Sequence, residues 1–127
     1  MIHLNSFSKS EHLCGEKRIA KLFDTGEAFI VYPLRIVFLV EHKTEPIAAS
    51  VLLSVPKKRF KRAVKRNRLK RLMRESYRLN KHELVEKLNQ SLVHMDIAFN
   101  YISDEEMDFQ AIEKKMKVAL NRLIEKL

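Results

Sequence analysis

Apolar residues in the first half of the chain come in short runs that turn residues separate. Ile19, Leu22 and Phe23 form a stripe that predicts a helix over residues 14–24, ended by Thr25-Gly26. The apolar runs that follow are interrupted by Pro33 and by a turn over residues 43–46. They predict three strands, over residues 28–32, 34–41 and 47–55. Because these strands are apolar on both sides, we expect each face of the sheet to be at least partly covered.

The second half alternates between helical and strand patterns. At about 100° per residue, one narrow helical face is formed by Leu69, Leu72, Met73, Ser76 and Leu79. Residues 81–90 either extend this helix or form a separate short one, and residues 92–101 alternate as a strand with one polar side. A terminal helix opens at the N-cap candidate Ser103, with acids in its first turn. Its apolar face is formed by Phe109, Ile112, Met116, Leu120, Leu123 and Leu127.

The element order α-β-β-β-α-β-α predicts one α+β or α/β domain over residues 1–127, with an irregular arm over residues 1–13. The length, with 46% hydrophobic and 32% charged residues, suits a globular domain. The single cysteine, Cys14, excludes an intramolecular disulfide and is expected to be a small buried residue. No apolar run has the length of a signal peptide core or a membrane span, so we expect a cytoplasmic protein.

Positive charge is concentrated between Lys57 and Arg78. Twelve bases and one acid, Glu75, give this stretch a net charge of +11, whereas the rest of the chain, with 13 bases and 15 acids, carries −2. Like charges on neighbouring turns destabilise a helix by a few tenths of a kcal/mol per pair. A surface that opposes its own folding in this way predicts a polyanionic partner rather than a merely solvated face.

RNA fits this basic helix better than DNA does. Guanidinium groups bind phosphate through two parallel hydrogen bonds, and arginine outnumbers lysine seven to five in the stretch. A helix that reads the DNA major groove usually has Asn, Gln or Ser among the basic residues of its first turns. Asn67 is the only residue of these three types in the first turns here. Four aromatic residues could stack on unpaired bases or equally pack in the core: Phe7, Tyr32, Phe38 and Tyr77. A membrane-surface helix is disfavoured because it would carry larger exposed hydrophobic residues.

Catalytic and metal-binding patterns are not found in the sequence. No histidine pair has the spacing of a zinc site, and no glycine-rich loop could hold phosphates. His94 and Asp96 share one face of the predicted strand, but two polar residues on a half-exposed strand need no catalytic role. The acids 105, 106 and 108 suit a helix start better than a cation site. We therefore predict no catalytic residues and no metal site on the protein.

A family resemblance appears in the basic stretch. Lys57-Lys58, followed by AVKRNRLKRLMRE over residues 63–75, resembles the signature of the bacterial ribonuclease P protein subunit, whose Arg-Asn-Arg hallmark stands at Arg66-Asn67-Arg68. Looser matches extend the resemblance over nearly the whole chain: Phe7-Ser8-Lys9, Leu13, Leu22-Phe23 before Gly26, and Tyr32-Pro33-Leu34. A three-residue match alone would be weak, whereas the extended pattern after a strand is specific.

The resemblance implies a fold and an activity. Proteins of this family form a small α/β sandwich with a four-stranded sheet and a left-handed β-α-β crossover, related in topology to the second domain of a ribosomal protein. In the holoenzyme, an endoribonuclease, the catalytic RNA subunit uses Mg²⁺ to remove the 5′ leader from precursor tRNA. The protein subunit binds that RNA through its basic helix and grips the single-stranded leader in a cleft between helix and sheet.

The resemblance also implies two sets of site residues. The RNA-binding set is Lys57, Lys58, Lys65, Arg66, Asn67, Arg68, Lys70, Arg71 and Arg74. The leader cleft is formed by Phe23, Phe38, Arg66, Asn67 and Lys70. Two departures from the family pattern affect the surroundings: the turn over residues 59–62 is one residue longer and lacks a glycine, and Ile19 replaces an aromatic residue. A ribosomal or RNA-chaperone protein without nuclease association remains the alternative, since it would show a similar basic helix.

Overall fold

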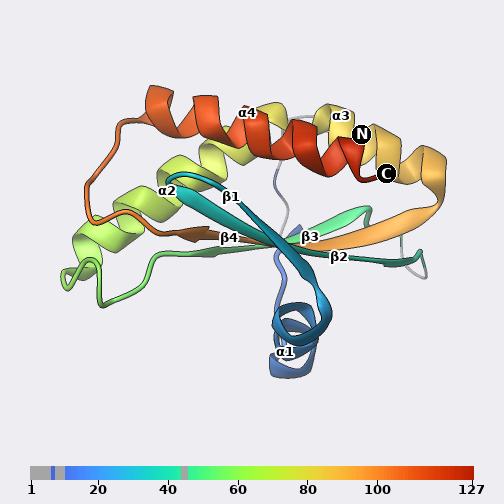
Figure 1. Ribbon diagram of the computed structural model, residues 1–127, viewed down its shortest axis with the longest axis horizontal. Helices are drawn as coiled ribbons and strands as arrows, with labels where there is room; N and C mark the ends of the chain where they lie inside the picture. The colour runs from blue at the N-terminus through green and yellow to red at the C-terminus, as the bar shows by residue number, and fades with distance from the viewer. Residues whose placement is uncertain (1–6, 8–10, 44–45) are drawn as a thin grey trace.

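The protein is described here by a computed structural model that covers residues 7, 11–43 and 46–127. The elements in chain order are α1 (Glu16–Thr25), β1 (Glu27–Val31), β2 (Leu34–His42), β3 (Ala49–Ser54), α2 (Ala63–Asn80), α3 (His82–Ser91), β4 (Val93–Tyr101) and α4 (Phe109–Glu125). The four strands form one sheet in the order β1-β2-β4-β3. Helices α2, α3 and α4 lie on one face of the sheet and α1 on the other (Figure 1). The prediction of an α+β domain with a sheet covered on both faces is confirmed.

The sheet is mixed because one connection crosses over it. β1 pairs with β2 and β2 with β4 in antiparallel fashion, whereas β3 and β4 are parallel neighbours joined through α2 and α3. This is the β-α-β crossover that the family resemblance implied, with the basic helix inside it. Of the two alternatives predicted for residues 81–90, the separate short helix is confirmed, because Lys81 belongs to neither α2 nor α3 (His82–Ser91) and lies between them.

The main core lies between the sheet and α2, α3 and α4, the three helices that cover one of its faces. Alternate residues of β2 and β4 point into it, so that Ile36 pairs with Phe99 and Phe38 with Ile97. α2 contributes its buried face of Leu69, Met73, Ser76 and Tyr77. The prediction that Leu79 belongs to this face is wrong, because Tyr77 fills the position over the core and Leu79 is left 39% exposed at the edge of the stripe.

Tyr77 and Phe7 pack inside the molecule. Tyr77 is fully buried, with its ring centre 5.8 Å from that of Phe99 and 5.5 Å from that of Phe7, which is itself half-buried against the core. Tyr77 therefore offers no stacking surface to RNA. Tyr32, in the turn that follows β1, is 54% exposed.

Replacing Tyr77 by phenylalanine should stabilise the fold. The Tyr77 hydroxyl is buried and has no hydrogen-bond partner in the described part of the chain, and this burial raises its pKa. Because an unsatisfied buried hydroxyl costs about 1–3 kcal/mol, urea denaturation of Tyr77→Phe should show a higher free energy of unfolding. Tyr101→Phe is the matched control, since the Tyr101 hydroxyl donates to the Glu105 carbonyl at 2.5 Å and its loss should be destabilising. A less stable Tyr77→Phe would contradict this reading.

Several predicted local features differ from the structure. Cys14 is exposed, because it precedes α1 on the surface side of the chain. Asp108, not Ser103, caps α4, since its carboxylate accepts a hydrogen bond from the Ala111 amide at 2.9 Å. Ser103 instead accepts from the Glu105 amide at 3.0 Å within the preceding bend. The predicted N-cap at Ser103 and the first-turn acids are therefore wrong.

Two further segments are only partly described. The predicted turn over residues 43–46 includes positions 44 and 45, which lie outside the described residues. The arm over residues 1–13 is described at residue 7 and residues 11–13, where His12 bridges Val51 and the Leu13 amide donates to the Val51 carbonyl at 2.9 Å. Among the described residues, no helix is long and apolar enough to cross a membrane.

Candidate nucleic-acid interface

The loop that leads into α2 is fastened to the helix by one arginine. α2 begins at Ala63, so residues 57–62 precede the helix rather than belonging to it. The Arg66 guanidinium donates to the carbonyls of Phe60 at 2.8 Å and Lys61 at 2.7 Å. Phe60 is buried, with its ring centre 5.9 Å from that of Tyr101. The turn over residues 59–62, which departs from the family pattern, is thereby fixed against both the helix and the core.

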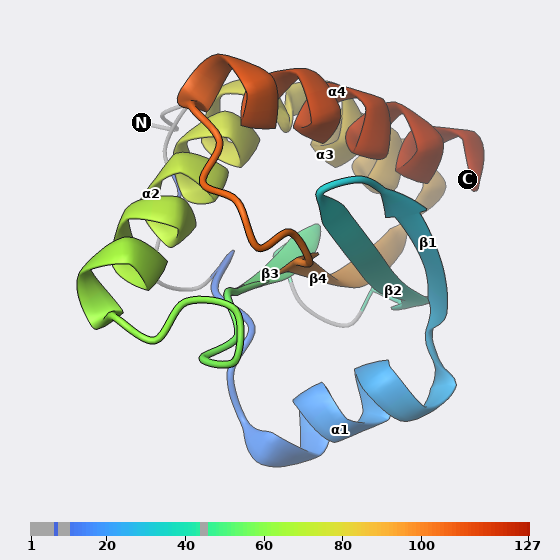
Figure 2. The same cartoon turned by 60° about the vertical axis from the view of Figure 1, so that its left-hand side comes forward.

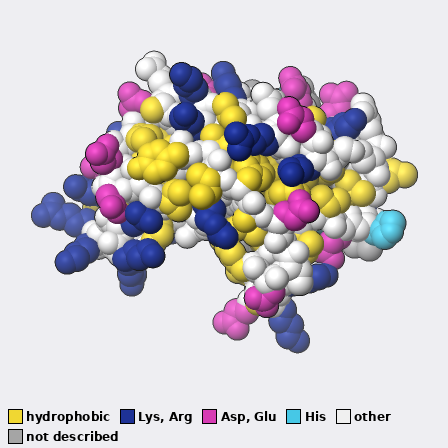
Figure 3. All heavy atoms as spheres, viewed as in Figure 1, with side chains coloured by type: hydrophobic (Ala, Val, Ile, Leu, Met, Phe, Trp, Pro, Cys, Tyr) yellow, Lys and Arg dark blue, Asp and Glu magenta, His cyan; other side chains and the backbone are white. Residues whose placement is uncertain are grey.

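The predicted RNA-binding residues gather at the N-terminal end of α2 and on the loop before it. Figure 3 shows Lys and Arg side chains crowded over this end of the molecule. The exposed members are Lys57, Lys58, Lys65, Asn67, Arg68, Arg71 and Arg74. Arg66 and Lys70 are half-buried beside them. The structure thus brings the set together on one surface, while its binding to RNA stays a prediction.

The two sides of α2 differ in their neighbours. We call the side of Lys65 and Arg68 the acid-facing flank, because Glu106 lies 3.6 Å from the Lys65 amine and 3.5 Å from the Arg68 guanidinium. We call the side of Arg66, Lys70 and Arg74 the open flank; it follows i, i+4, i+8 spacing. Within residues 7, 11–43 and 46–127, none of these three side chains forms an ion pair with an acid. The open flank therefore presents positive charge that no described acid offsets.

The predicted leader-cleft residues are not all brought together. Phe23 lies on α1 and is 42% exposed. Phe38 is only 4% exposed, and its ring packs edge-on against Phe29 in the core beneath the helices. Side chains alternate along a strand, so Val37 rather than Phe38 faces α1. The prediction that Phe38 lines an open cleft together with Phe23 is wrong.

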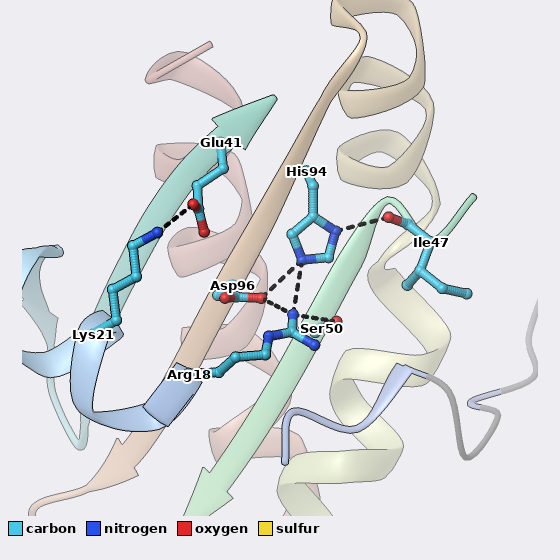
Figure 4. Close-up of polar contacts among 7 residues, drawn as sticks. All are labelled: Arg18, Lys21, Glu41, Ile47, Ser50, His94 and Asp96. Carbon is cyan, nitrogen blue, oxygen red and sulfur yellow. Dashed lines mark hydrogen bonds and ion pairs between the residues drawn. The ribbon is translucent and has the colours of Figure 1, made fainter. Parts of the chain in front are cut away.

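A polar network on the α1 side of the sheet was missed by sequence reasoning (Figure 4). Asp96 Oδ1 lies 2.7 Å from both the Arg18 guanidinium and His94 Nε2, and His94 Nδ1 lies 2.7 Å from the Ile47 carbonyl oxygen. Ser50 adds a weaker contact to Arg18 at 3.4 Å. The expectation of a half-exposed polar side on β4 is wrong, because α1 covers His94 and Asp96. The spacing of these two residues was visible in the sequence, but Arg18 is 78 positions from Asp96.

The network joins α1 to the sheet through Arg18 and Asp96. The Ile47 carbonyl oxygen can accept a hydrogen bond from His94 Nδ1. His94 Nε2 lies beside both the Asp96 carboxylate, which accepts, and the Arg18 guanidinium, which lies 3.3 Å away and can only donate. The hydrogen bond to Asp96 raises the pKa of His94 against the opposing effect of burial. Burial alone would raise the pKa of Asp96, but the His94 hydrogen bond and the Arg18 charge together lower it.

The free energy of unfolding should therefore be highest at a pH between the ordinary pKa values of Asp96 and His94, and lower on either side. The His94 contribution is present below its ordinary pKa of 6.5 and is lost as the pH rises through its raised folded value. The Asp96 contribution is present above its ordinary pKa of 3.8 and is lost as the pH falls through its lowered folded value. Glu41, which pairs with His94 in register, is bound to Lys21 at 2.6 Å.

Urea denaturation should show the parent less stable at about pH 8 than at about pH 6, and His94→Gln should lose most of that difference. An equal pH dependence in His94→Gln would contradict the assignment.

Metal ligands are not clustered in the described part of the chain. No group of three or more His, Cys, Asp or Glu side chains there could hold a metal ion.

Comparison with protein families gives a match over almost the whole chain. The family described as "Ribonuclease P" matches residues 7–124. The chain is 48% identical over 116 residues to a ribonuclease P protein component from Porphyromonas gingivalis, covering 91% of this chain and 85% of that protein. It is 38% identical over 109 residues to the ribonuclease P protein component of Chlorobium phaeobacteroides, covering 80% and 75% of the two chains.

Solved structures share the fold. The ribonuclease P protein of Staphylococcus aureus superposes with a TM-score of 0.69 at 18% identity, covering 90% of this chain and 95% of that one. The ribonuclease P protein of Thermotoga maritima gives a TM-score of 0.66 at 22% identity, covering 88% and 96%. The arrangement of four helices on a mixed four-stranded sheet is therefore common to these proteins.

Proposed function

The chain belongs to the ribonuclease P protein family, and from this premise we propose that it binds the catalytic RNA subunit of ribonuclease P and the 5′ leader of precursor tRNA. The observation that carries the proposal is the open flank of α2, whose three cations have no acidic partner among the described residues. Arg71 and Asn67 extend this surface outward, and the lysines at 57 and 58 extend it onto the loop. Such a surface suits phosphates on a continuous strand.

The protein's role is electrostatic and positional. The bond-breaking chemistry, with its Mg²⁺ ions, belongs to the RNA subunit in this proposal, and the protein supplies no catalytic residue. A polyanionic catalyst and a polyanionic substrate repel each other, and a cationic surface between them lowers that repulsion. The protein would then act by tightening the binding of substrate and of Mg²⁺. The place of action that this implies is the bacterial cytoplasm.

Leader binding is assigned to a reduced set of residues. Arg66, Asn67 and Lys70 remain candidates because they lie on or beside the open flank, and Phe23 remains one because its ring is exposed. An exposed aromatic ring can stack on an unpaired base of any identity. This set excludes Phe38, whose ring is committed to the core.

Reconstituted cleavage separates this function from the alternative. The purified chain is mixed with a bacterial ribonuclease P RNA and a precursor tRNA at a low Mg²⁺ concentration at which the RNA alone cleaves slowly. We expect the protein to accelerate removal of the 5′ leader. A ribosomal or RNA-chaperone protein would bind many RNAs and confer no such cleavage, so binding without acceleration would overturn the proposal.

A further inference from the structure

The segment between β4 and α4 places acids against the basic helix. Residues 102–108 run beside the N-terminal half of α2 (Figure 2). Glu106 contacts both cations of the acid-facing flank, and Asp104 lies 3.1 Å from the Arg59 guanidinium. These two acids therefore face the part of the chain, α2 and its loop, that carries all of the excess positive charge.

This segment is held in place by hydrogen bonds to buried residues. The Tyr101 hydroxyl donates to the Glu105 carbonyl, and the Glu105 amide donates to the hydroxyl of Ser103, which is 1% exposed. The Ile102 amide donates to the Pro33 carbonyl at 2.8 Å, and Asp108 caps α4 at the other end. The Glu106 carboxylate is therefore carried on a fixed backbone rather than on a loose loop.

A hollow opens between this segment and the start of α2. Its volume is about 450 Å³, and its wall includes Arg62, Lys65, Asp104 and Glu106. A phosphate that approached Lys65 through the hollow would meet two carboxylates at the same time. Because Lys65 and Arg68 are each about half exposed, they stay within reach of RNA that displaces the carboxylate.

Resting on the function proposed above, we propose that Glu106 competes with RNA phosphates for Lys65 and Arg68 and so lowers the affinity of α2 for RNA that makes only backbone contacts. The competition is confined to the acid-facing flank. RNA is thereby directed to the open flank, where no described acid must be displaced. Glu106 is a specificity-determining residue in this account. RNA that makes further contacts with the protein has enough binding free energy to displace the Glu106 carboxylate, whereas RNA that makes only backbone contacts does not.

The test compares two single charge removals. Glu106→Gln removes the competing carboxylate, and Glu105→Gln removes the same charge from the neighbouring residue, which forms no ion pair among the described residues. The probes are a uridine oligonucleotide and a bacterial ribonuclease P RNA, each titrated at several KCl concentrations. Urea denaturation confirms that both variants are folded.

Glu106→Gln should bind the uridine oligonucleotide about 3- to 10-fold more tightly at about 0.1 M KCl. Without the Glu106 carboxylate, Lys65 and Arg68 can both contact phosphates, so the slope of log K against log salt should steepen by about 1 to 1.5. Affinity of Glu105→Gln should change by less than about 2-fold. Unchanged or weaker binding by Glu106→Gln, or equal tightening by Glu105→Gln, would overturn the inference and leave the proposed function intact. Absence of salt-dependent binding of either probe by the parent would overturn both.

Discussion

Replacing Lys70 and Arg74 together by alanine should weaken binding of ribonuclease P RNA by about 30- to 150-fold at about 0.1 M salt. Both side chains lie on the open flank, so their loss removes phosphate contacts without releasing a buried acid. Charge-assisted hydrogen bonds are worth about 1–1.5 kcal/mol each at such partly solvated sites. Alanine is also the best helix former, and two like charges are removed, so α2 itself should remain folded.

The matched control removes the same charge from another helix. Lys114→Ala with Lys126→Ala removes one exposed lysine from α4 and one from the C-cap that follows it. Electrophoretic mobility shift or fluorescence anisotropy titrations should give near-parental affinity for this control and a salt slope reduced by about 1.4 to 1.8 only for the α2 variant. Equal losses in the two double variants would mean that net charge, not the open flank, determines binding.

Leu69→Ala should lower the free energy of unfolding by about 3 kcal/mol, within the range of 2–5 kcal/mol that is typical of a leucine in a packed core. Leu69 is fully buried directly beneath the Arg-Asn-Arg segment and packs in the main core. Its truncation removes apolar contacts and leaves a cavity, because the sheet and α4 hold the surrounding residues in place. The loss should be visible as a lower midpoint of urea denaturation.

Val64→Ala is the control on the same helix. Val64 lies in the first turn of α2 and is 79% exposed, and a surface substitution of this kind changes stability by about 0.5 kcal/mol or less. If the two variants lost equal stability, α2 would not be docked through the face that the structure shows.

The basic helix and most strands could be predicted because their signals are local. The apolar spacing of Leu69 and Met73 has the period of a helix, and the acid-poor charge pattern lies within the same few turns. The breaks at Pro33 and Gly26 separate elements that the structure confirms within one or two residues. Local patterns of this kind survive folding because tertiary packing uses the same faces.

Other features could not be predicted because they depend on which elements meet. β2 is apolar on both faces, so the sequence could not tell that Phe38 faces the helices while Val37 faces α1. The contact of Arg18 with Asp96 joins residues 78 positions apart and leaves no local pattern. Ser103 and Asp108 are both good N-cap residues, so the sequence alone does not tell which of them begins α4. In the structure the Ser103 hydroxyl accepts a hydrogen bond within the bend of residues 102–107, which leaves Asp108 to cap the helix.

The central claim is that the exposed cations of α2 and its loop bind RNA phosphates, and salt dependence tests it most directly. Binding of the parent chain to a bacterial ribonuclease P RNA is measured across a series of KCl concentrations. With about six phosphate contacts, log K should fall against log salt with a slope near −4 to −5. An affinity that stayed constant as KCl increased, or no binding even at low salt, would contradict the account.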